Sequence, residues 1–492
     1  MKRFKGVVVL LLVFSLVFAF ASCGTSQKSN NNPMASGGVD ITNKVPDTGL
    51  FVYFNVSREN TKALQDLQKK LIDAGILPLS TENSDASDLI ETMRQVMDKY
   101  SDITKGQYGI IAIDLKKVKE LEDKDIESVK PEDGVYMVFV AQFTKEVKVK
   151  NYLGDVQSVV EKLKNDEDMK GQIVVNPTNG TMTVKPEGGP EITFYFENKG
   201  KNIIMTLGEP FSKMPKVDKP ISKNEFWKEA SSHSFAVYLD PTAIPDEDTR
   251  NELVNAGWQK PIRVFGDITS SEKDGVYTSN FTLSAYNPTG KKFTDLGISG
   301  DVKVVKNADI ILALDTDLIV NMIDMASDTT KELEGYKQMA DMLSGGVITL
   351  SGAIQSTQKM AGALIGQYFK DPSKLWGMIS GTLDQYLEGL KYSVPGVYTK
   401  SQQTEDGFDI IVGTYQPQMV SEKIDGAPVL YLRLNIDPDK YKDIFSSLDP
   451  ELKKTLDDYA KVVDNVEITL KVTYDEEKNI TGVAVSSVVK TK

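Results

Sequence analysis

Four short apolar stretches of this 492-residue chain run straight into an asparagine or an aspartate, and a segment with helical spacing follows each of them. An apolar run of about five residues predicts a buried strand. A carboxylate or amide directly after it can accept hydrogen bonds from the unpaired N–H groups of a helix. The pattern therefore predicts four strand-to-helix junctions. They are LFVYFN at 50–55, FAVYLD at 235–240, IILALD at 310–315 and VLYLRLN at 429–435.

The second and fourth junctions continue alike, which indicates an internal duplication. Asp240-Pro241 and Asp437-Pro438 lead into helical segments at 246–257 and 438–461, and a hairpin with alternating apolar and polar residues follows each. The chain is also longer than one hydrophobic core usually spans. We therefore expect an α+β protein of two related halves, each an antiparallel sheet covered on one face by helices. The halves are residues 45–295 and a shorter 296–492.

Other periodic stretches predict further strands and helices. Turns at Asn179-Gly180 and Asn198-Lys199-Gly200 separate short strands, so their pairing should be antiparallel. In the helix at 60–75, the apolar side chains are spaced to cover one face of a sheet; they are Leu64, Leu67, Leu71 and Ile72. The expected strands are 134–143, 172–176, 181–185, 191–197 and 202–207. The other expected helices are 86–101, 149–164, 317–343, 360–369 and 375–390.

Methionines gather in the expected helices of the second half. One interpretation is a methionine-lined cavity for an acyl chain or another apolar ligand, because thioethers adapt to irregular apolar shapes. Helical spacing favours the alternative, ordinary core packing. The residues are Met322, Met325, Met339, Met342, Met360 and Met378.

The chain begins with the features of a secretory signal peptide. Three basic residues precede an uncharged run that ends just before the single cysteine, Cys23. The apolar part of this run, at 7–20, is about 15 residues long, short of the roughly 20 that a membrane-spanning helix needs. Ala19-Phe20-Ala21 fits ordinary signal peptidase, cleavage directly before Cys23 is the second reading, and an uncleaved anchor is the third.

Residues 20–23, Phe-Ala-Ser-Cys, resemble a bacterial lipobox, with phenylalanine in place of the usual leucine. The resemblance implies that residues 1–22 are removed as a lipoprotein signal peptide. It also implies that the Cys23 thiol receives diacylglycerol and that the new amine is acylated. A lone cysteine in an exported chain has no disulfide partner, and lipidation accounts for it. We therefore expect lipidation at Cys23 and a flexible linker at 23–44, since 24–38 are rich in Ser, Asn and Gly.

The body of the protein is acidic. The whole chain has a formal net charge of −13, and removal of residues 1–22 takes three of the 57 basic residues and none of the 70 acidic ones. Like charge repels the phosphates of nucleic acids, so no nucleic-acid partner is expected. An acidic surface also keeps a soluble body dispersed.

Two local motifs resemble a loosely defined group of bacterial exported proteins and lipoproteins that carry domains of unknown function. The first is a P-x-D-T start of a strand within 45–52. The second is the passage from 222–227 to the strand at 234–238. The likeness covers much of residues 45–245. It implies an α+β fold in the periplasm or on the cell surface, and it supplies no activity.

Hydrolase chemistry has little support in the sequence. The only histidine, His233, would have to be the base of a Ser-His-Asp triad, yet the chain has no Gly-x-Ser-x-Gly motif. We expect His233 to be a turn residue. The Ser-x-x-Lys tetrads at 270–273, in an expected hairpin turn, and at 356–359 lack the companion Lys-Thr-Gly of penicillin-binding enzymes. Asp437 and Asp439 are one acidic pair among many in this chain, so their spacing does not identify a glycosidase.

Metal and cofactor sites are also poorly supported. Zinc sites need clustered His and Cys ligands, whereas this chain has one of each. The acidic clusters at 246–248 and 475–477 could offer oxygen ligands to calcium, but neither has the EF-hand spacing. Acidic residues are also common at turns and helix N-termini. No phosphate-binding glycine loop follows an expected strand, and no cofactor is expected.

These observations predict a lipid-anchored protein of the bacterial cell envelope, with a non-catalytic binding or structural role and an unidentified ligand. The membrane is the expected partner, through the anchor at Cys23. One alternative is a periplasmic or surface carrier of lipid or another hydrophobic ligand. A second is a hydrolase that uses Asp/Glu or Ser/Lys. Gly24 is not the aspartate that often retains a lipoprotein in the inner membrane, which leaves the outer membrane or the cell surface open.

Overall fold

The structure is a computed structural model that shows two compact units. The first unit ends at Ser271 and includes Pro288–Gly290, and the second consists of Glu272–Asn287 and Lys291–Lys492. The expected halves differ from these units mainly in placing 272–287 in the first. The structure describes residues 38–73, 95–96, 99–100, 102–122, 130–163, 173–185, 190–255, 257–258, 260–289, 292–327, 334–356, 358–445 and 457–492.

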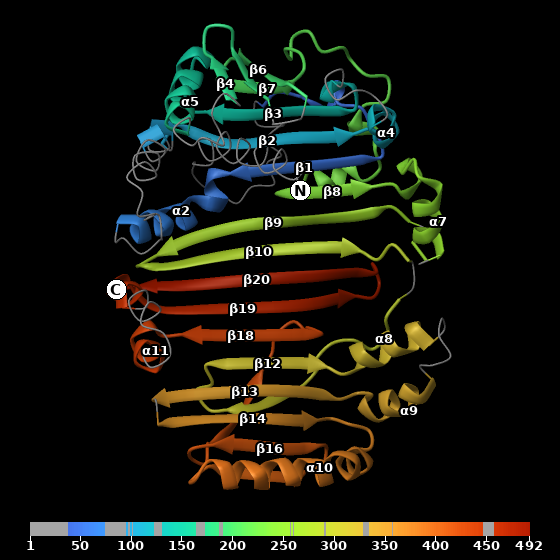
Figure 1. Ribbon diagram of the computed structural model, residues 1–492, viewed down its shortest axis with the longest axis vertical. Helices are drawn as coiled ribbons and strands as arrows, with labels where there is room; N and C mark the ends of the chain where they lie inside the picture. Colours follow the sequence, from blue (N-terminus) through green and yellow to red (C-terminus); the bar gives the residue numbers. More distant parts are fainter. Residues whose placement is uncertain are drawn as a thin grey trace. The chain divides into compact units, whose positions relative to one another are not determined.

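The first unit is built on an antiparallel sheet in the order β4-β5-β6-β7-β3-β2-β1-β8-β9 (Figure 1). Strand β7 is buried at every position and β3 at most of its positions, so both faces of the sheet are covered at its centre. The strands are β1 (Leu50–Ser57), β2 (Thr104–Ile113), β3 (Val135–Phe143), β4 (Ile173–Asn176), β5 (Thr181–Val184), β6 (Ile192–Lys199), β7 (Asn202–Leu207), β8 (Phe235–Leu239) and β9 (Ile262–Lys273).

Helix α5 supplies much of the core of the first unit. Its buried residues Leu153 and Val156 belong to one apolar cluster with Phe139 and Phe143 of β3 and Met205 of β7. Burying such side chains stabilises a fold by about 1.5–3 kcal/mol each. The helices are α2 (Arg58–Asp73), α4 (Leu115–Glu122), α5 (Val149–Leu163), α6 (Trp227–Ala230) and α7 (Glu247–Asn255), with 3₁₀ turns at Thr42–Lys44, Pro131–Asp133, Ile221–Lys223 and Pro241–Ala243.

The second unit also contains an antiparallel sheet, in the order β10-β20-β19-β18-β12-β13-β14-β16-β15. The strands are β10 (Val276–Tyr286), β12 (Ile310–Asp315), β13 (Val347–Ser356), β14 (Lys359–Gln367), β15 (Tyr398–Gln403), β16 (Phe408–Gly413), β18 (Leu430–Ile436), β19 (Val463–Asp475) and β20 (Ile480–Thr491).

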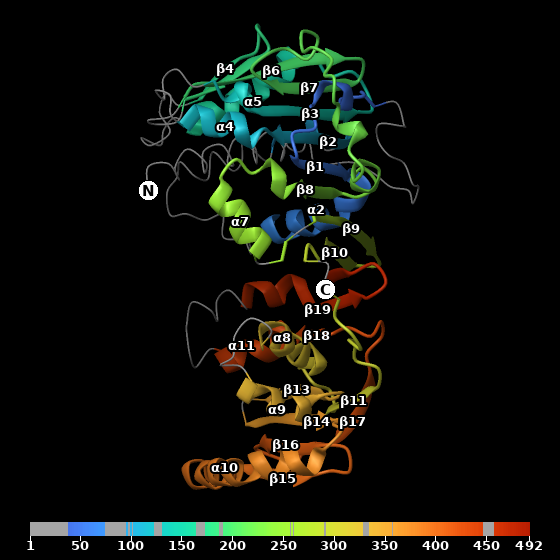
Figure 2. The same ribbon diagram turned by 90° about the vertical axis from the view of Figure 1, so that its right-hand side faces the viewer.

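A separate two-stranded ribbon of β11 (Asp301–Val305) and β17 (Met419–Lys423) contacts β13 and β14 (Figure 2). Val302 and Val304 of this ribbon share a buried cluster with Ile311 and Ala313 of β12. The core of this unit therefore lies partly between ribbon and sheet. The helices are α8 (Asp317–Ser327), α9 (Glu334–Leu343), α10 (Pro372–Ser393) and α11 (Pro438–Phe445).

The α+β class and the antiparallel pairing are confirmed. The four apolar stretches are strands β1, β8, β12 and β18, and the two alternating hairpin arms after residue 462 are β19 and β20. No helix among the described residues combines the length and the apolar character required to cross a membrane. Most of the expected helix at 86–101 lies outside the described residues, as does much of the segment 438–461 after Phe445.

The expected helix at 360–369 is wrong, because residues Lys359–Gln367 form strand β14. This strand pairs with β13 on one side and β16 on the other, and Ala361, Ala363 and Ile365 are buried along one face. Because β14 consists largely of Ala, Gly and Met residues, its sequence shows no clear alternation of apolar and polar side chains. The single expected helix at 317–343 is two helices, α8 and α9.

The predicted capping holds at two of the four junctions. Asp240 accepts a hydrogen bond from the Thr242 N–H, and Asp315 accepts one from Asp317. The other two acceptors, Asn55 and Asn435, lie inside β1 and β18 because these strands continue past them. In those cases Ser57 and Asp437 accept the first helical N–H groups.

Two predictions about apolar side chains need correction. In α2, Leu67 is buried, but Leu64 is exposed, because Ala63 instead faces the sheet together with Leu67. The expected methionines do not line one common cavity within the described part of the structure, and the side chains of Met325 and Met339 lie outside that part. Met322, Met360 and Met378 are all exposed, although Met342 is buried. Core packing is therefore also wrong for these three.

Candidate functional site

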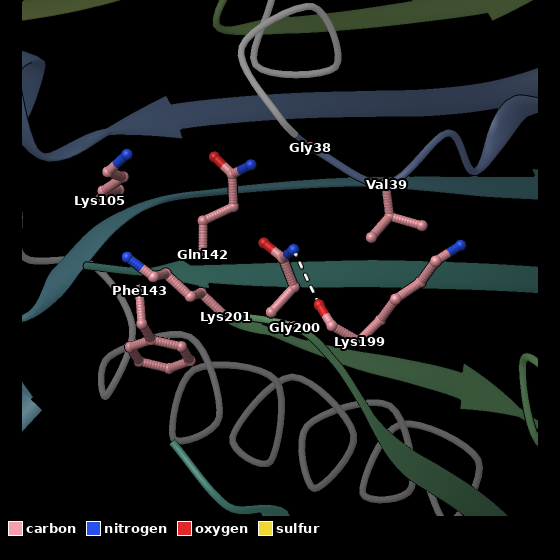
Figure 3. Close-up of a pocket in the computed structure, with 9 residues that line it drawn as sticks. Gly38, Val39, Lys105, Gln142, Phe143, Lys199, Gly200 and Lys201 are labelled. Carbon is pink, nitrogen blue, oxygen red and sulfur yellow. Dashed lines mark hydrogen bonds between the residues drawn. The ribbon is translucent and has the colours of Figure 1, made fainter. Parts of the chain in front are cut away.

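A basic pocket of about 350 Å³ lies in the first unit, where the described chain begins (Figure 3). The ends of β2 and β3, the β6–β7 hairpin and the first two described residues form its walls. Its lining combines three lysines with two amide side chains. The lining residues are Gly38, Val39, Lys105, Gln142, Phe143, Lys199, Gly200, Lys201 and Asn202.

Strand register brings the pocket residues together from distant parts of the chain. Gln142 of β3 pairs directly with Asn202 of β7 on one side and with Gly106 of β2 on the other. Directly paired residues project to the same face of a sheet, so the two amides share a face. Because Gly106 has no side chain, nothing from β2 covers Gln142 at that position.

Lys105 owes its position to an irregularity in β2. The register between β2 and β3 shifts between Thr104 and Gly106, which leaves Lys105 as the extra residue. Such a bulge bends the strand and re-aims the side chain. Gly106 cannot be replaced without a shift of structure, since an added Cβ would lie 2.9 Å from the Val56 carbonyl oxygen of β1.

Lys199 and Lys201 lie on either side of Gly200 in the β6–β7 hairpin. Lys199 pairs with Asn202, so Gly200 and Lys201 are the two central residues of the turn. Gly200 has a φ of 61°, as the first central residue of a type II′ turn requires. The Asn202 side chain closes the turn by donating a hydrogen bond to the Lys199 carbonyl, 3.1 Å away (Figure 3). The expected turn at 198–200 is therefore displaced by about one residue.

The remaining wall of the pocket is fixed by one buried phenol. The Tyr108 hydroxyl accepts a hydrogen bond from the Val39 N–H at 2.6 Å and donates one to the Val39 carbonyl at 2.9 Å. Tyr108 is fully buried in β2, and burial raises the pKa of its hydroxyl. A neutral phenol can perform both roles at any physiological pH, so Val39 is held firmly over the sheet.

The pocket concentrates positive charge on an acidic protein. In the described part of the chain, no carboxylate lies within ion-pairing distance of Lys105, Lys199 or Lys201, although Lys199 lies over the Phe211 ring at 5.7 Å. The neighbouring Asp40 carboxylate is occupied locally. It accepts hydrogen bonds from the Thr42 N–H and hydroxyl and from the Asn43 amide.

A second hollow, of about 340 Å³, lies in the second unit and is mostly apolar. Gly352 of β13 pairs with Gly362 of β14, which pairs in turn with Val412 of β16. Two adjacent glycines leave a shallow depression between the exposed side chains of Ile310 and Met360. Its polar edge is Asp309, which forms an ion pair with Lys440. The arrangement suits an apolar group.

His233 stands at the turn before β8, as expected, and it contacts an acid. Its Nδ1 lies 2.8 Å from an Asp267 oxygen, and its ring stacks on Phe265. Burial acts to raise the pKa of Asp267, but hydrogen bonds from His233 and from the Ser234 N–H outweigh it and lower this pKa. The Ser234 hydroxyl accepts the Ile268 N–H rather than facing the imidazole. The pair therefore ties the turn to β9.

The two Ser-x-x-Lys tetrads lie at hairpin ends. Ser356 pairs with Lys359 across the turn between β13 and β14, and its hydroxyl accepts the Gln358 N–H. Residues 270–273 form the end of β9 rather than the turn, which is at Asp274-Gly275. Neither tetrad aligns a lysine with its serine in a buried cleft.

The acidic candidates have structural partners. A hydrogen bond from the Thr249 N–H lowers the pKa of Asp246, which caps α7. The Lys478 N–H does the same for Asp475 in the β19–β20 turn. Asp437 caps α11, and Asp439 pairs with Lys492. Across the described ranges, no group of three or more His, Cys, Asp or Glu could hold a metal ion. Cys23 lies outside the described residues.

The lysine pocket is not predicted from the sequence, although part of its signal is visible there. The turn at Asn198-Lys199-Gly200 is predicted, but no role follows from it for the two lysines beside the glycine. Strand β2 is not predicted, so Lys105 has no predicted place in the fold. Comparison with known proteins adds nothing here, because no protein-family model, curated protein or solved structure matches the chain.

Proposed function

We propose that this protein is an extracytoplasmic lipoprotein, anchored through Cys23, with a non-catalytic binding role. The observation that best supports a binding role is the lysine pocket, in which three lysines lie around two amides and have no acidic partner among the described residues. Pockets of about 300–1,000 Å³ with a few convergent polar groups are typical small-molecule sites. The basic and apolar residues before Cys23 support export.

The binding body is a duplicated one. Support comes from the strand orders of the two units. The first contains β9-β8-β1-β2-β3-β7-β6, and the second contains β19-β18-β12-β13-β14-β16-β15. Helices also occur at equivalent points along the chain. Helices α2 and α8 follow β1 and β12, α5 and α10 follow β3 and β14, and α7 and α11 precede β9 and β19. The helices would cover one face of each sheet.

Matching backbone hydrogen bonds give the duplication residue-level support. Asn55 donates its N–H to the Ser234 carbonyl, as Asp315 does to Val429. Six residues further along the partner strand, the Asp240 N–H reaches Gly49, and the Asn435 N–H reaches Asp309. The two donors and the two acceptors keep the same spacing in both units.

The β11–β17 ribbon also has a counterpart in the first unit. Pro46 forms a bridge with Pro220, the Asp47 N–H donates to Lys219, and the Ile221 N–H donates to Val45. These two segments precede β1 and β8, just as β11 and β17 precede β12 and β18. Parallels in strand order, backbone hydrogen bonds and the ribbon are unlike chance similarity. One ancestral unit was therefore copied, and the lysine pocket lies in the first copy.

The anchor is tested by labelling growing bacteria with an alkyne fatty acid. We expect label on the wild-type protein and complete loss of label in Cys23→Ala, because the thiol and the amine of this residue receive all of the lipid. Ser22→Ala keeps a small residue before the cysteine and serves as the matched control, which should stay labelled. Unchanged label in Cys23→Ala would contradict the anchor.

A second candidate function, transport of a hydrophobic ligand, is favoured by the apolar hollow beside Met360. Native mass spectrometry of the non-lipidated chain, purified gently, should then show a co-purifying lipid. Gly362→Val should displace it, because a side chain at this lining position takes up space in the hollow, and its Cβ meets nothing closer than the Ser351 carbonyl oxygen at 3.6 Å. A mass without lipid in the wild-type protein would count against transport.

A further inference from the structure

We propose that the pocket of Lys105, Lys199 and Lys201 is a binding site for the phosphate group of an organic ligand. The inference deepens the proposed binding role and rests on it, but binding of a soluble phosphate needs no lipid anchor. Two observations carry it. The first is the unpaired charge of the three lysines, and the second is a buried amide that faces the same space.

The pocket lysines differ from two other lysines of this chain in having no carboxylate beside them. Lys303 and Lys440 are held by buried carboxylates at 2.7 and 2.6 Å, whereas the pocket lysines have no such partner among the described residues. The chain is acidic as a whole, with 70 acidic against 57 basic residues, so a pocket lined by three lysines and no carboxylate is a local basic site on an acidic protein. Their mutual repulsion is relieved when an anion binds between them.

The amide argument rests on Gln142. Its side chain is only 9% exposed and makes no hydrogen bond within the described residues, while it faces the pocket between Lys105 and Lys199 in the view of Figure 3. The amide is not among the buried polar atoms that lack a partner, so its N–H groups stay accessible from the pocket and are free to meet a ligand. The Asn202 amide, also 9% exposed, lies beside it on the same face. A bound acceptor would satisfy the Gln142 Nε2–H.

The chemistry of the lining favours phosphate over other ligands. Lysine ammonium groups are point-charge donors that bind phosphate oxygens, and amide N–H groups add neutral donors. Val39 adds an apolar side chain to the lining, whereas the Phe143 ring points to the opposite face of the sheet and into the core (Figure 3). The volume of about 350 Å³ leaves room for an organic group attached to the phosphate.

The phosphate can belong to a soluble metabolite or to a phospholipid headgroup. Fifteen residue steps separate Cys23 from Gly38, and a fully extended chain of that length spans at most about 54 Å. The pocket of the anchored protein therefore lies within reach of the headgroup layer. The reach to the headgroups depends on the proposed anchor, whereas the attraction of the lysines for a phosphate does not.

The test is titration calorimetry on the complete mature chain carrying Cys23→Ala. The soluble probes are glycerol 3-phosphate and inorganic phosphate, and the membrane probes are vesicles of phosphatidylglycerol with phosphatidylcholine and of phosphatidylcholine alone. We expect saturable, salt-sensitive binding of glycerol 3-phosphate or of the phosphatidylglycerol vesicles. Binding of the soluble probe identifies a metabolite site, and binding of the vesicles alone identifies a headgroup site.

Variants locate the binding. Lys105→Gln and Lys201→Gln should each weaken it about tenfold, since a charge-assisted hydrogen bond contributes about that much. Lys116→Gln makes the same charge change on exposed α4 and should leave binding intact. Gln142→Leu should weaken binding while changing thermal stability little, because the amide that is removed makes no hydrogen bond within the described residues. If Gln142 had a purely structural role, its replacement would lower thermal stability and binding together.

The proposal is overturned if no phosphate probe binds the wild-type chain. Equal weakening by Lys116→Gln and Lys105→Gln would overturn it as well, because the attraction would then be a general surface effect. Fatty-acid labelling at Cys23 is independent of these outcomes, so a failed anion site and a failed anchor are distinguishable.

Discussion

Gly407→Ala is expected to destabilise the second unit by about 3 kcal/mol, at the upper end of the usual cost of overpacking. Gly407 is buried just before β16, and a Cβ added to it would lie 2.0 Å from the Gly366 carbonyl oxygen of β14. The obstructing atom belongs to the backbone of a central strand, so relief requires the β14–β16 pair to separate. Urea unfolding measures the effect. Trp376, which stacks on Phe408 with ring centroids 6.3 Å apart, reports on this region by fluorescence.

Gly381→Ala is the matched control in the same unit. An added Cβ at this position of α10 meets no heavy atom within 4 Å. Because alanine favours a helix over glycine by up to about 1 kcal/mol, the control should be neutral or slightly stabilising. Equal unfolding midpoints for the two variants would mean that β14 and Gly407 do not approach as closely as described.

Lys303→Met is expected to cost about 3 kcal/mol of unfolding free energy. The Lys303 ammonium lies 2.9 and 2.7 Å from the two Asp409 oxygens, and the carboxylate is only 2% exposed. Removal of the cation leaves a buried negative charge whose remaining hydrogen-bond partner among the described residues is the Gln402 amide. The lysine side chain is one-third exposed, which places the cost at the lower end of the range for buried pairs.

Chemical denaturation of a double-mutant cycle separates this effect from lost packing. Asp409→Asn in the Lys303→Met background should recover part of the loss, because no uncompensated charge remains. Lys423→Met removes a lysine from an exposed pair with Asp425 and should change stability by less than about 1 kcal/mol. If Lys303→Met and Lys423→Met lose the same small amount, the buried pair does not stabilise the attachment of β11 to β16.

The sequence predicts those strands whose alternation or apolar run is clear in β-branched and aromatic residues. β3, with VYMVFVAQF, and β19, with VEITLKVTY, are examples. It fails for β14, whose small residues pack against close neighbours. An added Cβ at Gly366 would touch the rings of Phe408 and Phe369, contacts that no local pattern reveals.

The lysine pocket could be predicted only in part, for a physical reason. The turn at Gly200 is a local feature, because its positive φ selects glycine. The approach of Lys105 to that turn is not local. It depends on the register that aligns Gly106, Gln142 and Asn202 across three strands, and a shift of one residue would turn Gln142 to the opposite face.

The measurement that tests the central claim most directly is the intact mass of the protein extracted with detergent from the membranes of its own cells. Lipidation at Cys23 predicts a chain that begins at residue 23 and carries the added mass of a diacylglycerol and an amide-linked acyl chain. A chain that retains residues 1–22, or one that begins at Cys23 without added lipid mass, would contradict the account.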